Sequence, residues 1–84
     1  MLSVDFDPAA DMVTIAGDPT ALRDLSERLL RLASSAEVGS LDHDHLRSNA
    51  WAGHELSDLP NPRTGASAHV VYHVKIYGLP SNVR

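Results

Sequence analysis

Residues 17–39 read GDPTALRDLSERLLRLASSAEVG, and this stretch decides the fold that the sequence predicts. Asp18 can accept hydrogen bonds from the free N–H groups of a first helical turn, and Pro19 suits the first helical position because it has no N–H to donate. Gly39 is typical of a helix end. Charged residues cover one side of the segment, and apolar residues recur at helical spacing on the other: Leu22, Leu25, Leu29, Leu32, Ala33 and Ala36. We expect an amphipathic helix that packs one side against the rest of the chain.

Two short strands are expected before this helix. Residues 2–7 alternate apolar and polar side chains, which is the pattern of a strand with one buried and one solvated face. Residues 12–16 contain β-branched side chains suited to a second strand. The segment DPAAD at residues 7–11 lies between them, and Asp followed by Pro favours a turn. The pattern predicts an antiparallel hairpin.

The chain after the helix predicts two further strands. Residues 41–47 are expected to form a short polar strand, and residues 67–77 show the clearest alternation in the sequence. Part of the intervening stretch, around residues 51–56, should be structured, because a long structureless loop is unusual in a small domain. The order is β-β-α-β-β in a single domain covering residues 1–84. We expect an α+β two-layer sandwich in which the helix covers one face of a four-stranded, mainly antiparallel sheet.

The expected core joins the helix to the apolar faces of the strands. Its predicted members are Leu2, Val4, Phe6, Val13, Ile15, Leu22, Leu25, Leu29, Val70 and Val74. A core of this size gives marginal stability, and one helix leaves the second face of the sheet open. A protein partner or a second copy of the chain, as in a homodimer, is expected to cover that face.

Composition excludes several classes of function. Seven Lys and Arg against eleven Asp and Glu give a net charge of −4, which argues against a nucleic-acid partner. There is no cysteine, so thiolate metal sites and cysteine nucleophiles are excluded, and a reducing, cytoplasmic location is expected. The N-terminal residues show no signal-peptide or membrane-span pattern. We find no phosphate-binding loop or catalytic motif, and expect neither an enzyme nor a cofactor.

Five histidines leave open a metal-binding alternative. His43 and His45 lie two residues apart and would share one face of a strand, as two ligands of Zn²⁺ or Ni²⁺ can. A third ligand would have to come from His54, His69 or His73 across the fold. His69 and His73 would lie about 13 Å apart along a single strand, too far to hold one ion. We interpret them as surface or interface residues.

Other residues are candidates for partner recognition. Trp51 is the only tryptophan, and its irregular segment could present it as an interface anchor, although a buried lid over the sheet is the favoured interpretation. An acidic surface for a basic partner is a further hypothesis, with a solvated strand face as the simpler alternative. Its members would be Asp5, Asp7, Asp11, Asp42 and Asp44.

Four segments together resemble a known family. They are SVDFDP at residues 3–8, VTIAG at 13–17, the helix leucines 22, 25, 29 and 30, and HDHL at 43–46. In element order and residue character the chain resembles small bacterial immunity proteins of polymorphic toxin systems, and most closely immunity protein family thirty-two. The resemblance implies a non-catalytic protein that binds and blocks a cognate toxin. The alternatives that stay open are a small histidine-based metal-binding protein and a structural homodimer subunit.

Overall fold

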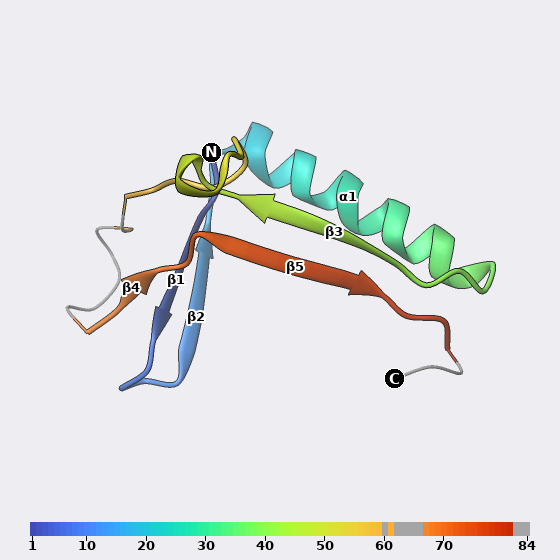
Figure 1. Cartoon of the computed structure of the whole chain (residues 1–84), viewed down its shortest axis with the longest axis horizontal. Helices are drawn as coiled ribbons and strands as arrows, with labels where there is room; N and C mark the ends of the chain where they lie inside the picture. The colour runs from blue at the N-terminus through green and yellow to red at the C-terminus, as the bar shows by residue number, and fades with distance from the viewer. Residues whose placement is uncertain (60, 62–66, 82–84) are drawn as a thin grey trace.

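The computed structural model describes residues 1–59, 61 and 67–81. Its elements follow the order β1 (Ser3–Asp7), β2 (Met12–Ala16), α1 (Pro19–Glu37), β3 (Asp42–Arg47), the 3-10 turn η1 (Asn49–Trp51), β4 (His69–Val70) and β5 (His73–Gly78). Figure 1 shows β3 and β5 running beneath α1, with the β1–β2 hairpin directed away from them. The hairpin, the helix and the strand after the helix confirm the sequence predictions. In the described part of the chain, no helix combines the length and apolar character needed to cross a bilayer.

The ends of α1 are set by the residues that the sequence singled out. The Asp18 carboxylate accepts a hydrogen bond from the Ala21 N–H at 2.8 Å, which satisfies one of the free donors of the first turn. Pro19 follows at the start of the helix. Gly39 has a φ of +86°, a conformation that glycine adopts without steric cost, and the chain leaves the helix there.

The prediction of one four-stranded sheet is wrong. In the described residues, β2, β1 and β4 form one antiparallel sheet in that order, and β3 and β5 form another. The single strand expected over residues 67–77 is divided between them, and the break lies at Val71 and Tyr72. Val71 N–H donates to the Val4 carbonyl at 2.7 Å, whereas the Tyr72 carbonyl accepts from the Ser48 N–H at 3.0 Å. Two adjacent residues thus bind opposite sheets, and the strand direction changes between them.

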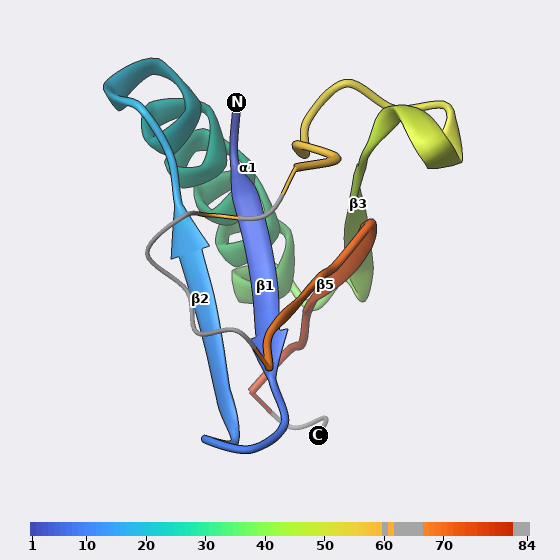
Figure 2. The same ribbon diagram turned by 90° about the vertical axis from the view of Figure 1, so that its left-hand side faces the viewer.

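The helix covers the β3–β5 sheet more than the hairpin. Its contacts with strands are made mainly to β3 and β5, and Figure 2 shows α1 behind the strands, with β2 at one edge. Leu32 is the buried residue of α1, and its carbonyl oxygen lies where a side chain at Gly78 would be, 2.6 Å from the position of a Cβ there. Glycine at this position lets the helix and β5 approach closely.

The core is smaller than the sequence predicts. Leu2, Val4, Leu46 and Leu56 form the buried cluster. Leu56 was not among the predicted core residues, because it lies in the stretch whose structure the sequence did not reveal; it forms isolated bridges to Leu2 and Ser48. Four predicted core residues are instead between 44% and 58% exposed in the single chain, so the prediction is wrong for them: Val13, Ile15, Leu22 and Leu29.

Candidate functional site

The side of the β3–β5 sheet that faces away from α1 forms the candidate site. Leu46 is buried, and Val74 and Ile76 pack against the core, so alternate residues of the same strands must point to the opposite side. We call this side the outer face. It consists of the six alternate residues of the two strands together with Trp51 from η1: His43, His45, Arg47, His73, Lys75, Tyr77 and Trp51.

Five aromatic and imidazole rings form a continuous row along the outer face. The ring centroids of Tyr77 and His43 lie 5.5 Å apart, those of His43 and His45 5.1 Å, and those of His45 and His73 4.9 Å. Trp51 ends the row, with its ring centroid 5.5 Å from that of His73. The antiparallel register makes the row possible, because it places His43 directly opposite Tyr77 and brings the ring of His73 diagonally toward His45.

A hydrogen bond joins the two central imidazoles. His45 Nδ1 lies 2.7 Å from His73 Nε2, so one of these nitrogens carries a proton and the other accepts it. Burial lowers the pKa of His45 below its ordinary value, and the nearby charges of Arg47, His73, His43 and Lys75 lower the pKa further. The lowered pKa favours the neutral form of His45 at pH 7, and a neutral imidazole can either donate or accept in this hydrogen bond.

Trp51 is presented to solvent on this face. Trp51 is 57% exposed, so the favoured interpretation of Trp51 as a buried lid is wrong. The 3-10 turn explains the exposure: Ala52 follows in the left-handed conformation with a φ of 61°, and the Gly53 N–H returns to the Ser48 carbonyl at 2.9 Å. The chain therefore turns back before the indole can reach the core.

The charge of the outer face is opposite in sign to that of the whole chain. Arg47 and Lys75 lie among the rings, and the Lys75 ammonium is 4.9 Å from the centroid of Tyr77. None of the seven outer-face residues, all within the described ranges, is an acid, although the chain carries a net charge of −4. The face therefore favours contact with a surface that bears carboxylates.

The outer face combines rings with two cations. Its seven members are three imidazoles, a phenol, an indole, a guanidinium and an ammonium group. The His45–His73 pair is too close to bracket a metal ion, since its nitrogens already share a proton at 2.7 Å. Among the described residues, no group of three or more His, Asp or Glu side chains is placed to hold a metal.

The remaining predicted metal ligand lies elsewhere. His54 borders a cavity of about 550 Å³ near the start of α1, together with Asp18, Arg28 and Glu55. The structure thus brings His43 and His45 together on one strand but does not add His54 to them. The charged groups of this cavity are used in ion pairs: the Met1 ammonium binds Asp18 at 3.2 Å, and Arg28 lies 3.8 Å from Glu55.

The expected acidic surface is not assembled. Asp5 is 1% exposed and accepts a hydrogen bond from the Asn61 N–H at 3.0 Å. Asp7 is also buried, and its carboxylate accepts from the Ser67 hydroxyl at 2.6 Å, which lowers the pKa of Asp7. The side of β1 expected to be solvated is therefore covered by the chain itself. Asp44 forms an ion pair with Arg28 at 3.1 Å.

Two of the predicted acids remain exposed but do not lie together. Asp11 ends the turn between β1 and β2, and Asp42 begins β3. Figure 1 shows the hairpin turn and the start of β3 at opposite ends of the molecule.

The two histidines predicted to share a strand face are separated. His69 belongs to β4 and stacks edge to face against Phe6, with 5.7 Å between ring centroids. His73 belongs to β5 and joins the ring row. The division of the predicted strand at Val71 and Tyr72 is the reason, because it places the two residues in different sheets.

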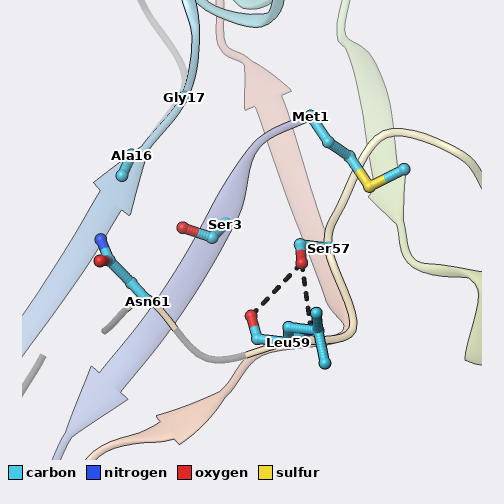
Figure 3. A pocket seen from close by; sticks show the side chains of 7 residues that line it. All are labelled: Met1, Ser3, Ala16, Gly17, Ser57, Leu59 and Asn61. Carbon is cyan, nitrogen blue, oxygen red and sulfur yellow. Dashed lines mark hydrogen bonds between the residues drawn. The ribbon is translucent and has the colours of Figure 1, made fainter. Parts of the chain in front are cut away.

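A second cavity, of about 390 Å³, lies beside the start of β1 and offers little chemistry. Figure 3 shows its lining, in which the Ser57 hydroxyl is engaged with the backbone of Leu59. Small residues such as Ser3, Ala16 and Gly17 make up much of the remainder. Among these described lining residues there is no Asp, Glu, His, Lys or Arg side chain.

Sequence reasoning missed three outer-face residues: Arg47, Lys75 and Tyr77. The alternation of residues 73–77 already placed His73, Lys75 and Tyr77 on one face. The missing information was that the polar strand 42–47 is the partner of this segment, because the pairing of strands distant in sequence is not contained in local periodicity.

Comparison with known proteins identifies the family. No curated protein matches the chain, and no solved structure does. The family model for Immunity protein 32 matches residues 13–74, which is more than half of the chain and includes β2, α1, β3 and the start of β5. It also spans most of the ring row, from His43 to His73. The chain therefore belongs to the Immunity protein 32 family.

Proposed function

We propose that the protein is a non-catalytic immunity protein that neutralises a cognate bacterial toxin by binding it through the outer face. The observation that carries this proposal is the row of five rings on a sheet face that α1 does not cover. Membership of the family supports the toxin-neutralising role. The absence of cysteine is compatible with action in the cytoplasm, which we propose as the compartment.

The composition of the face resembles the centre of a protein interface. Tryptophan, tyrosine and arginine are the residues that most often contribute large shares of binding free energy, and Trp51, Tyr77 and Arg47 all lie here. Rings held against one another lose little conformational freedom on binding. The face therefore offers a pre-ordered surface that a toxin can cover without rearrangement of the sheet.

The charges indicate what the toxin surface is like. Arg47 and Lys75 favour a toxin patch that combines carboxylates with apolar side chains. Such charges accelerate association more than they increase affinity, and salt weakens their effect.

The test uses a toxin from the same bacterium whose lethality the wild-type protein blocks on co-expression. Trp51→Ala is expected to raise the dissociation constant of the complex at least about tenfold, because it removes a large exposed ring from the proposed contact surface. The double charge reversal Arg47→Glu with Lys75→Glu is expected to slow association at least about tenfold at low salt, with a smaller effect in high salt. Surface plasmon resonance measures both quantities, and growth of the co-expressing strain reports neutralisation.

Matched variants on the exposed side of α1 provide the control. Arg23 and Arg31 are exposed, and their reversal to Glu changes the net charge by the same amount as the outer-face variant. If that control slows association as strongly as the outer-face reversal, the effect is due to total charge and the outer face is not the site. The site would also be rejected if toxin binding were unchanged both in Trp51→Ala and in the double variant Arg47→Glu with Lys75→Glu.

A further inference from the structure

An apolar groove opens beside the core residues Leu46, Val74 and Ile76 of the β3–β5 sheet. It has a volume of about 360 Å³ and lies between the hairpin, α1 and β5. Its walls are apolar apart from His73, and the residues that matter here are Val13 and Ile15 of β2, Leu25 and Leu29 of α1, and Val74 and Ile76 of β5. In the part of the chain that the structure describes, no Asp, Glu, Lys or Arg lines it.

The groove lies where the sequence pattern predicts a closed core. Val13 and Ile15 are 58% and 54% exposed, and Leu29 of the opposing helix stripe is 44% exposed. Burial of such side chains stabilises a protein by roughly 1.5–3 kcal/mol each. A solvated groove therefore leaves out much of the stabilisation that a domain of this size needs.

The dimensions of the chain show how much surface is left uncovered. A compact monomer of 9.1 kDa exposes about 4,900 Å², whereas this chain exposes 5775 Å². Its radius of gyration is 14.1 Å, against about 12 Å for a compact domain of 84 residues. The excess area, about 900 Å², is close to the roughly 800 Å² that each partner buries in a stable protein–protein interface.

We propose that a second copy of this chain covers the groove, and that the two copies join through their β2 strands. In the described sheet, β2 pairs with β1 on one side and is an edge strand on the other. Free edges usually carry charges that prevent pairing, but β2 reads MVTIA and has none. The edge is therefore suited to pairing rather than protected from it.

The sequence of β2 is also complementary to itself. Antiparallel pairing about a twofold axis at Thr14 places Val13 of each copy opposite Ile15 of the other. Both side chains then lie on the groove side, beneath the helix stripes that carry Leu25 and Leu29. An uncharged contact also places no like charges opposite each other, although each chain carries a net charge of −4. The groove shares only His73 with the outer face, and the pairing of β2 does not depend on toxin binding, so this inference does not rest on the proposed function.

The experiment uses sedimentation velocity of the full chain over a wide range of concentration. The wild-type protein is expected to sediment as a dimer at micromolar concentration. Ile15→Asp is expected to weaken dimerisation at least a hundredfold, whereas Leu41→Asp, which places the same charge at an exposed apolar residue outside the groove, is expected to leave it unchanged. A wild-type protein that is monomeric throughout the range overturns the proposal and leaves the toxin as the candidate occupant of the groove.

A cross-linking variant keeps the proposal testable even if Ile15→Asp fails to fold. The natural chain has no cysteine, so Thr14→Cys introduces a single thiol at the proposed twofold axis, where antiparallel strands bring two Cα atoms within disulfide range. Mild oxidation is expected to give a disulfide-linked dimer of Thr14→Cys and little or none of the control, Leu41→Cys. Equal cross-linking of both variants, or none of Thr14→Cys, contradicts pairing through β2.

Discussion

Arg28 joins three parts of the chain through one guanidinium group. Its Nε lies 3.1 Å from the Asp24 carboxylate on the same helix, its Nη1 lies 3.1 Å from Asp44 on β3, and its Nη2 lies 3.8 Å from Glu55. The side chain of Arg28 is only 19% exposed, so these contacts are partly shielded from water and salt. Arg28 therefore fixes the helix to the strand whose opposite side carries His43 and His45.

Replacing Arg28 should destabilise the protein more than replacing its neighbour. Arg28→Ala leaves the half-buried Asp44 and Glu55 without their cation, and we expect a loss of about 2 kcal/mol in the free energy of unfolding. Arg31→Ala is the matched control, because Arg31 is exposed and reaches Asp44 only at 4.0 Å; we expect a change below about 0.5 kcal/mol. Urea unfolding followed by circular dichroism measures both. Equal losses would show that the contacts of Arg28 with Asp44 and Glu55 add no stability beyond that of an exposed helix arginine.

The acids of β1 show what the sequence does not reveal about single residues. Alternation correctly placed Asp5 and Asp7 on the side of β1 opposite Val4. It did not show that this side is covered, because the covering residues, Asn61 and Ser67, lie more than fifty positions further along the chain. A polar strand face is solvated only if no distant segment folds over it.

The contact between α1 and β5 depends on the absence of a side chain at one position. A Cβ at Gly78 would lie 2.6 Å from the Leu32 carbonyl oxygen, which belongs to the helix backbone and cannot rotate away. We expect Gly78→Ala to lower the free energy of unfolding by roughly 1–3 kcal/mol, since the helix must move to accommodate the methyl group.

Lys75→Ala is the control for this element, because Lys75 lies on the same strand but points to the outer face. It should change stability by less than half as much as Gly78→Ala, and thermal unfolding compares the two. If Gly78→Ala is as stable as the wild-type protein, the helix and β5 are less closely packed than described.

At the level of elements, the sequence predicts the structures that neighbouring residues determine, and it misses those that depend on hydrogen bonds to distant segments. The helix and the hairpin follow from Asp18, Pro19 and the turn at residues 7–11, whose signals lie within a few residues of the structure they determine. The strand at 67–77 was predicted as one element because its alternation continues through Val71 and Tyr72. The break arises from hydrogen bonds to Val4 of β1 and to Ser48, which directly follows β3. Local periodicity does not identify such distant hydrogen-bond partners.

Acidification is expected to lower the free energy of unfolding of the whole molecule in two ranges of pH. Burial, followed by nearby positive charges, lowers the pKa of His45, so its contribution to stability is present above about pH 6.5 and is lost as the pH falls through the lower folded-state value. Hydrogen bonds from Ser67 to Asp7, and from the Ala21 N–H to Asp18, lower the pKa of these carboxyl groups. Their contributions are present above about pH 4 and are lost below it.

We therefore expect the free energy of unfolding to fall in two steps on acidification from pH 7. His45→Asn should flatten the step that begins near pH 6.5, and Asp7→Asn should flatten the step below about pH 4. Each variant serves as the control for the other, because each should leave the other step in place. Urea unfolding at a series of pH values measures the profile. A single step that neither substitution alters would contradict the assignment.

The position of Trp51 gives the protein a built-in optical reporter. As the only tryptophan of the chain, it accounts for nearly all fluorescence excited at long wavelength, and its half-exposed indole lies at one end of the outer face, 5.5 Å from the ring of His73. A molecule that covers this face is expected to shift or quench the emission, whereas Trp51 is not among the residues that line the groove. The emission therefore reports occupancy of the outer face in unlabelled protein.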